Sequence, residues 1–180
     1  MELPKSEIQN VVASQSSIIL PKTLPTEIVD DLNSALADEY AAHYFYRRAF
    51  NWCAGVNYTK ASAFFEAESA AELEHAAKIQ KYLVDWNCTP TLPSVKFNGD
   101  FSSLIDIVNK AYGIEYKLAE KYNDISAKIF SQHLPTFDFL EEFRTIQTES
   151  IIEYSDLLNA AQLIDVSNKL DLLHYEERYF

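Results

Sequence analysis

The chain contains few of the residues that interrupt helices or crosslink a fold. Its 180 residues include three glycines, six prolines, two cysteines and one methionine. Glycine and proline are the main breakers of helices, so their scarcity allows long uninterrupted helices. The two cysteines, Cys53 and Cys88, are too few and unpatterned for a disulfide framework or a zinc motif. This composition predicts one all-α domain, and a reducing, cytoplasmic location is expected by default.

Positive charge and long apolar runs are also scarce. Lysine and arginine number 15 against 27 aspartates and glutamates, which gives a formal net charge of −12 at pH 7. This surplus of negative charge argues against nucleic acid or an anionic membrane as a partner. No stretch reaches the ~20 apolar residues that a membrane-spanning helix needs, and residues 1–20 lack the pattern of a signal peptide. The acidic surplus is typical of a solvated surface, and it also suits a protein that handles cations.

Apolar residues recur at alternating steps of three and four in four stretches, which is the period of a helix with one buried face. Near the middle of each stretch this apolar seam is interrupted by polar side chains. The four seams contain Leu32, Leu36, Glu39, His43, Tyr46, Phe50 and Cys53; Ala61, Phe65, Glu68, Glu72, His75, Ile79, Tyr82 and Trp86; Leu104, Val108, Ala111, Glu115, Leu118, Tyr122, Ile125 and Ile129; and Leu140, Phe143, Gln147, Ser150, Tyr154, Leu157 and Ala161. A carboxylate buried without a partner is costly, and no lysine or arginine lies on a seam, so the pattern predicts a cation taken from solvent. Oxygen-rich ligands with one imidazole suit iron or a related divalent metal.

Prolines, glycines and capping residues predict where the helices begin and end. Residues 1–25 contain three prolines, and we expect an N-terminal extension there. A four-helix bundle is predicted over residues 26–165, followed by a short helix or tail over residues 166–180. The predicted bundle helices are 26–55 with Thr26 as N-cap, 59–86, 102–131 and 136–164. Two tight hairpins joined by one long crossover at residues 87–100 distinguish this bundle from a simple up-down-up-down arrangement.

The interrupted positions give a candidate ligand set. Glu72 and His75 lie three positions apart, so both project from one face of a helix and can reach the same or adjacent ions. Glu39 and Glu115 each lie near the centre of a seam, where the alternative to metal binding is a hydrogen bond to a hydroxyl or amide. Gln147 is neutral, so it would ligate weakly or orient a bridging water or oxygen.

Four further polar residues face inward by the same periodicity. Tyr46 lies two turns beyond Glu39, where it could donate to a carboxylate, supply an electron or simply pack in the core. Glu68 and Ser150 have weaker claims to a metal. For His43, a neutral imidazole satisfied by a nearby tyrosine or carbonyl is the favoured interpretation.

The order and local sequence of these residues resemble those of non-haem ferritins. Glu39 with Tyr46, the run Glu72-Leu73-Glu74-His75, then Glu115 and Gln147 follow the order of that family across about residues 27–165. The resemblance implies a ferritin-like four-helix bundle with a ferroxidase centre that takes two irons per subunit. It implies that Glu39, Glu72 and His75 hold the first iron and that Glu72 bridges. Glu115 and Gln147 would then serve the second iron.

The same resemblance implies a function. The chain would oxidise Fe(II) with oxygen or peroxide and store the ferric mineral in a homo-oligomeric cage of 24 subunits. A single E-x-x-H pair argues against bacterioferritin and rubrerythrin, and the single methionine, Met1, removes the usual haem ligand, so no haem is expected. The alternative is a stand-alone di-iron or dimanganese oxidoreductase, or a small peroxide-consuming mini-ferritin.

The sequence leaves two features undecided, a third iron site and the role of a group of acidic residues. Many bacterial ferritins bind a third iron where this chain has Ala71, Ile146 and Ser150, although Glu68 and Glu149 leave another third position possible. Acidic residues at the start of the fourth helix would either line a pore for iron uptake or only complement the helix dipole. These acidic residues are Asp138, Glu141 and Glu142.

Overall fold

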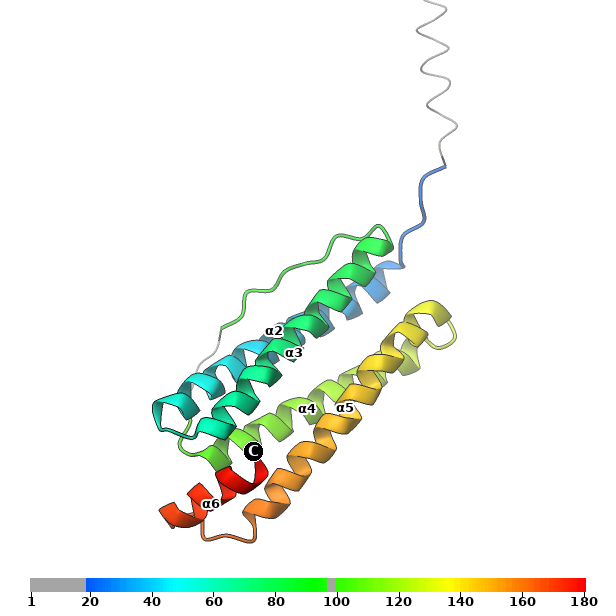
Figure 1. Ribbon diagram of the computed structural model, residues 1–180. Helices are drawn as coiled ribbons and strands as arrows, with labels where there is room; N and C mark the ends of the chain where they lie inside the picture. Colours follow the sequence, from blue (N-terminus) through cyan, green and yellow to red (C-terminus); the bar gives the residue numbers. More distant parts are fainter. Residues whose placement is uncertain (1–18, 97–99) are drawn as a thin grey trace, which may run out of the picture.

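The computed structural model describes residues 19–96 and 100–180, and within these residues helices are joined by turns and loops without any strand (Figure 1). The helices are α2 (Thr26–Gly55), α3 (Thr59–Asp85), α4 (Leu104–Ile129), α5 (Leu134–Ala161) and α6 (Lys169–Tyr179). The predicted all-α bundle with a short C-terminal helix is therefore confirmed. None of the helices in the described ranges is long and apolar enough to cross a membrane.

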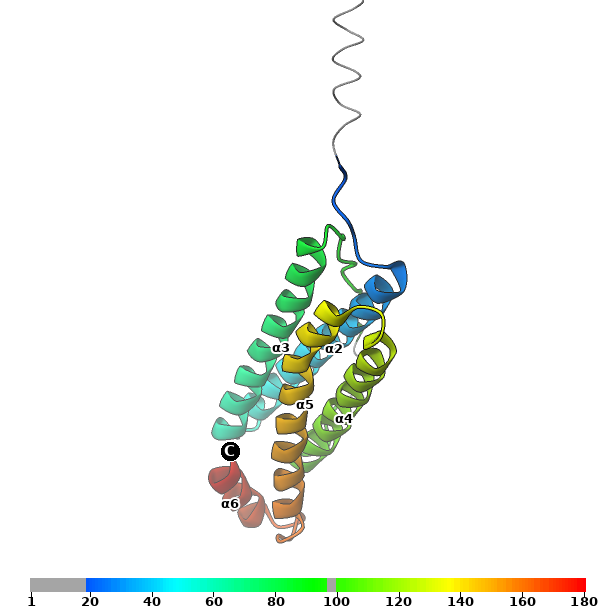
Figure 2. The same cartoon turned by 90° about the vertical axis from the view of Figure 1, so that its right-hand side faces the viewer.

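The four long helices form two hairpins, α2 with α3 and α4 with α5 (Figures 1 and 2). The connection between α3 and α4 runs along the length of the bundle, so α4 begins at the end where α2 finishes. This is the predicted long crossover. Helix α6 lies across the same end of the bundle, close to the turn between α2 and α3.

Local chemistry accounts for most helix boundaries. The Ser103 hydroxyl accepts a hydrogen bond from the Asp106 N–H at 3.0 Å and so caps α4. His133 caps α5 through its ring nitrogen, and α5 begins at Leu134, two residues earlier than predicted, because proline is tolerated in the first turn of a helix. The predicted N-cap Thr26 is wrong: Pro25 occupies that position, and its carbonyl oxygen accepts from the N–H groups of the first turn.

The predicted N-terminal extension is described only from residue 19 onward. Residues 1–18 lie outside the described residues, and the predicted divisions after residues 25 and 165 remain predictions. Leu24 is buried, so the last residues of this segment already belong to the core.

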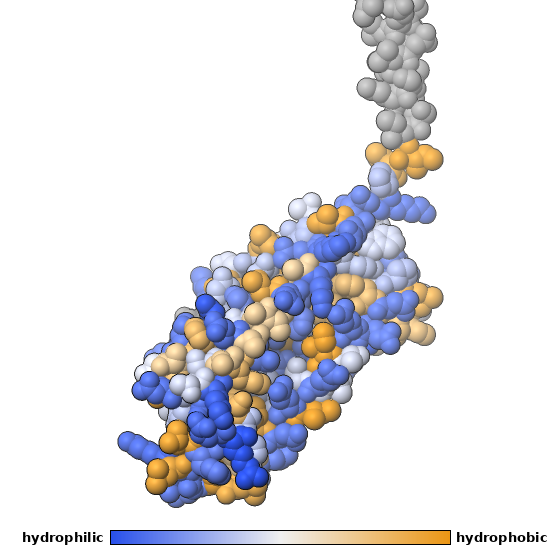
Figure 3. Space-filling model, in the orientation of Figure 1, coloured by the Kyte–Doolittle hydropathy of each residue, from blue (hydrophilic) through white to orange (hydrophobic). Residues whose placement is uncertain are grey.

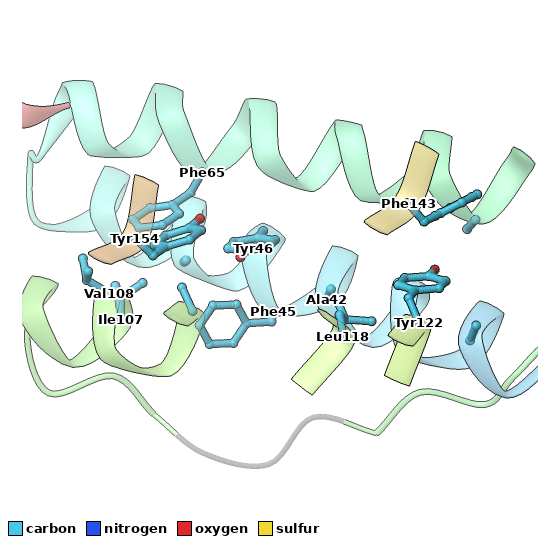
Figure 4. Close-up of a cluster of buried hydrophobic side chains, with 14 of the residues drawn as sticks. Ala42, Phe45, Tyr46, Phe65, Ile107, Val108, Leu118, Tyr122, Phe143 and Tyr154 are labelled. Atoms are coloured by element: carbon cyan, nitrogen blue, oxygen red, sulfur yellow. The ribbon is translucent and has the colours of Figure 1, made fainter. Parts of the chain in front are cut away.

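The seams meet in one continuous core (Figure 4). All residues of the third predicted seam are buried, whereas His43, Phe50, Glu68 and Ser150 on the other seams are only half-buried. Aromatic rings fill the middle of the bundle, and Tyr46 stacks on Tyr154 with 6.1 Å between ring centroids. On the face turned toward the viewer in Figure 1, hydrophilic residues are interspersed with apolar ones (Figure 3).

Helix α6 is held to the bundle by a buried carboxylate. Glu176 is 1% exposed and accepts hydrogen bonds from the backbone N–H groups of Lys60 at 2.6 Å and Ala61 at 3.0 Å. These are among the N–H groups that have no partner inside α3, so Glu176 caps α3 from a distant part of the chain. The Tyr175 hydroxyl donates to the carbonyl oxygen of Leu157 at 2.8 Å and fixes α6 against α5.

We expect Glu176→Ala to lower the free energy of unfolding by about 1–2 kcal/mol, because two N–H groups at the start of α3 lose their acceptor. Chemical denaturation followed by circular dichroism measures this change. Glu177→Ala is the matched control, since the exposed ion pair of Glu177 with Lys60 should contribute at most about 1 kcal/mol. Equal losses from the two substitutions would show that the capping interaction adds nothing.

Candidate metal centre

Two carboxylates and one imidazole converge in the core between α2 and α3. Glu39, Glu72 and His75 are all buried, and one ligand atom from each lies within 4.8 Å of the other two. The His75 Nδ1 atom is 3.0 Å from Glu72 Oε2 and 3.5 Å from Glu39 Oε2. The spacing of three residues places Glu72 and His75 on one face of α3, and the α2–α3 hairpin brings Glu39 against that face. These three residues form the compact part of the predicted ligand set, and we call them the first cluster.

Two tyrosines reach across from one hairpin to the other and hold carboxylates there. The Tyr122 hydroxyl of α4 donates a hydrogen bond to Glu39 Oε1 on α2, and the Tyr46 hydroxyl of α2 donates to Glu115 Oε1 on α4. Each tyrosine lies seven residues, or about two turns, after the glutamate of its own helix. The two hydrogen bonds therefore cross between the same faces of α2 and α4, where Figure 4 shows Tyr46 and Tyr122 in the core.

Glu115 belongs to the second half of the predicted site and is already engaged. Its Oε1 atom accepts from Tyr46. In the amide orientation that satisfies its hydrogen bonding, Gln147 donates to Glu115 Oε2 at 2.8 Å and to the main-chain oxygen of Glu115 at 3.1 Å. The structure thus places Gln147 beside Glu115 as expected, but the two residues stabilise each other and lie outside the first cluster.

The electrostatics of the first cluster are those of two carboxyl groups that share one proton. Burial raises the pKa of Glu72 well above its usual value, and two effects of Glu39 act in the same direction: it accepts a hydrogen bond from protonated Glu72, and its own charge is negative. Burial also acts to raise the pKa of Glu39, but hydrogen bonds with His75, Glu72 and Tyr122 outweigh it and lower that pKa. Without a metal, Glu72 keeps a proton and Glu39 is ionised.

One carboxylate oxygen of the first cluster lacks a hydrogen-bond partner in the described part of the chain. Glu39 Oε2 is buried and has no hydrogen-bond donor among the described residues when both glutamates are ionised. It faces Glu72 and the His75 ring. A divalent cation at this point would satisfy the oxygen and replace the shared proton, and its ligands would be the oxygen and nitrogen atoms that iron accepts. The residues present therefore fit a bound metal ion.

The weaker candidates have other partners. His43 Nδ1 donates to the carbonyl oxygen of Ser69 at 2.6 Å, which ties α2 to α3 and gives the imidazole the carbonyl partner that was expected for it. Glu68 Oε2 accepts from the Tyr154 hydroxyl at 3.2 Å, and burial and the charge of Glu153 raise the pKa of Glu68 to about 7. The structure does not bring His43 or Glu68 into the first cluster.

No role for Tyr122 was predicted from the sequence, although this residue lies on a seam. The sequence does contain a pattern that points to Tyr122, because Glu115 and Tyr122 are seven residues apart, as are Glu39 and Tyr46. A tyrosine two turns from a core carboxylate on each of two facing helices indicates reciprocal hydrogen bonds once the pairing of the helices is known. The spacing alone does not name the partner.

The fold and the cluster define a class of protein, a four-helix bundle whose core gathers carboxylates and a histidine for a metal ion. Residues 29–164 match the ferritin family, described as a ferritin-like domain, and the chain belongs to that family. Membership supports iron storage as the general function of the chain.

Individual relatives match most of the chain. It is 27% identical to the bacterial non-heme ferritin of Campylobacter jejuni over 143 residues, which is 78% of this chain and 86% of the relative. It is 29% identical to the Ferritin-2 heavy chain of Schistosoma mansoni over 154 residues, or 79% of this chain and 87% of the relative.

Solved structures agree on the fold. A ferritin of Chlorobium tepidum superposes with a TM-score of 0.77 at 24% identity and covers 86% of this chain and 96% of its own. An open pore ferritin from Archaeoglobus fulgidus superposes with a TM-score of 0.81 at 18% identity, with 87% and 98% covered. At these identities the solved structures establish the fold alone.

Stability of the metal-free protein should depend on pH through the buried carboxyl groups. Burial raises the pKa of Glu115 from 4.5 to about 7, so the folded chain keeps a proton that the unfolded chain releases at lower pH. Between these two values the folded state binds more protons, and the contribution of Glu115 to the free energy of unfolding falls as pH rises from about 4.5 to about 7. Urea denaturation at a series of pH values measures the slope.

Glu115→Gln should flatten this slope, and the same substitution at the exposed Glu120 of α4 should leave it unchanged. A slope that is unaffected by Glu115→Gln would contradict the assignment of a retained proton.

Proposed function

We propose that the chain oxidises Fe(II) at a buried centre formed by Glu39, Glu72, His75, Glu115 and Gln147, and that it stores the ferric product. Iron is the substrate here. The observation that carries this proposal is the buried Oε2 atom of Glu39 beside Glu72 and His75, which has no hydrogen-bond donor in the described part of the chain once Glu72 is also ionised. Among the described residues no lysine or arginine is buried in the core that could satisfy these carboxylates, so a cation from solvent is the partner that the geometry supports.

The ligand types explain why such a centre would oxidise iron and then release it. Carboxylate oxygens are hard donors that favour Fe(III) over Fe(II), so bound iron is easier to oxidise by oxygen or peroxide. Gln147 supplies a neutral amide in place of a carboxylate or histidine, which weakens the hold on the second iron. Tyr46 holds Glu115 by a hydrogen bond, and we assign it a tuning role without direct contact to iron.

The two halves of the proposed centre differ in whether their carboxylate oxygens are free to bind an ion. The first cluster is assembled, and Tyr122 leaves one oxygen of Glu39 free to face the ion. Glu115 must give up hydrogen bonds to Tyr46 or Gln147 before it can bind. Binding of two ions should therefore be sequential, with a tighter first step.

Storage requires a cavity that one bundle cannot enclose, so we propose that copies of the chain assemble into a cage, with 24 subunits as the expected number. Exposed apolar side chains on and before α6 support assembly, because such side chains are usually covered. They are Leu163, Val166, Leu170 and Leu173. The cytoplasm remains the proposed location. The native mass and iron content of the particle would separate a cage from the alternative of a stand-alone oxidoreductase or mini-ferritin.

We further propose that acidic residues in the first turns of α5 attract iron. Glu142, in the third turn of α5, forms an ion pair with Lys78 of α3 at 2.6 Å. Its charge is therefore compensated locally, and Asp138 and Glu141 are the acidic residues of this group that remain exposed without a described ion pair.

The double substitution Glu72→Ala with His75→Ala should reduce Fe(II) oxidation to the spontaneous rate, because the first ion loses two of its three ligands. Stopped-flow absorbance after mixing Fe(II) with aerobic protein measures the rate. His174→Ala removes an exposed histidine of α6 and should leave oxidation unchanged. A parent protein no faster than the spontaneous reaction would refute the ferroxidase assignment and leave the fold intact.

Titration of the metal-free protein with Co(II) under calorimetry should resolve two binding steps per chain, the first at least about tenfold tighter, which corresponds to about 1.4 kcal/mol. Glu115→Gln should weaken or remove the second step and keep the first. If this substitution weakened the tighter step instead, the order of binding would be wrong.

A further inference from the structure

A groove lies on the outside of the bundle between α2 and α4. Its volume is about 280 Å³. Two charged residues, Asp38 and Lys117, line it, and Asp38 is already paired with Lys121. The rest of the lining is apolar and consists of Ala41, Ala42, Phe45, Ile114 and Leu118.

The floor of this groove is also the wall of the metal centre. Ala42 lies three residues after Glu39 and Leu118 three residues after Glu115, so each floor residue shares the inner face of its helix with a glutamate of the centre. Both floor residues are almost fully buried, at 1% and 3% exposure. Figure 4 shows Ala42 and Leu118 between the rings of Phe45 and Tyr122.

The two crossed hydrogen bonds between α2 and α4 lie on either side of Ala42 and Leu118 along the helices. Tyr46 reaches Glu115 on one side of Ala42, and Tyr122 reaches Glu39 on the other. The smallest side chain of this region, Ala42, therefore lies midway between the two hydroxyl–carboxylate contacts. On each helix one residue that lines the groove thus lies about one turn from a carboxylate of the proposed centre, Ala42 from Glu39 and Leu118 from Glu115.

The lining selects the kind of molecule that can occupy the groove. A hydrated Fe(II) ion would lose water there without gaining oxygen ligands, since the one carboxylate is engaged by a lysine. Hydrogen peroxide needs hydrogen-bond partners, and the apolar floor of Ala42 and Leu118 offers none, although Asp38 and Lys117 line the same groove. Dioxygen is small, uncharged and poorly hydrated, so it gains from an apolar groove.

We propose that this groove binds dioxygen and admits it to the centre through the wall of Ala42 and Leu118, by a route separate from that of iron. The proposal rests on the proposed ferroxidase function, because it names the path of the second substrate of that reaction. The side chain that would have to move is that of Leu118, because Ala42 has no side-chain torsion beyond its methyl group.

A substitution at the rim tests the route without altering the centre. Ala41 is exposed and lines the groove, so Ala41→Phe should fill it from outside. Ala54→Phe is the matched control, since Ala54 is an exposed alanine of the same helix that does not line the groove. Crystals of the parent and both variants under xenon pressure report on the groove directly, because xenon occupies small apolar spaces. We expect xenon in the parent and in Ala54→Phe, and none in Ala41→Phe.

Kinetics then test whether the groove serves the reaction. In Ala41→Phe the apparent KM for dioxygen should rise about fivefold, which corresponds to about 1 kcal/mol, while Co(II) affinity and oxidation of Fe(II) by hydrogen peroxide should match the parent. An unchanged KM for dioxygen in Ala41→Phe overturns the proposal, with or without xenon in the groove. If the proposed ferroxidase function itself is wrong, the result is a different one: the parent protein would oxidise Fe(II) no faster than buffer with either oxidant.

Discussion

Burial of three carboxylates in one helical core is the constraint on which the rest of this structure depends. Glu39, Glu72 and Glu115 are at most 4% exposed, and ionised carboxylates are stable in such surroundings only with donors or cations close by. The described part of the core offers tyrosine hydroxyls, one amide and one imidazole. When both Glu39 and Glu72 are ionised, these donors leave one oxygen of Glu39 unsatisfied, and that oxygen marks the point where a cation would be stabilised.

The crossed tyrosine contacts connect this constraint to the architecture. Tyr46 and Tyr122 join carboxylates on different hairpins, so the site is complete only when the two hairpins are packed together. The same contacts make the site unequal, since one carboxylate keeps a free oxygen and the other is engaged on both oxygens. They also define the wall of Ala42 and Leu118, beyond which an apolar groove reaches the surface. The positions of the candidate ligands and of the groove thus follow from one register between α2 and α4.

Much of the fold could be predicted from the sequence because helix period and chain breakers are local signals. The predicted ranges fall within a few residues of α2 to α5, and the long crossover follows from the prolines after α3. The errors lie at helix ends, where Pro25 replaces Thr26 as the N-cap and Pro135 is absorbed into α5. The docking of α6 by Glu176 was not predictable, because the N–H groups that it caps belong to residues more than a hundred positions earlier.

The sequence by itself identified the side chains whose chemistry suits a metal ion. It also determined that Glu72 and His75 share a helix face, because a spacing of three residues acts within one helix. Only the tertiary structure decided that Glu39 joins this pair, that Tyr122 donates to Glu39, and that Gln147 engages Glu115. These choices depend on how far each helix is rotated about its axis and how the hairpins are staggered. Packing of side chains across the whole core sets both quantities, and no local spacing contains them.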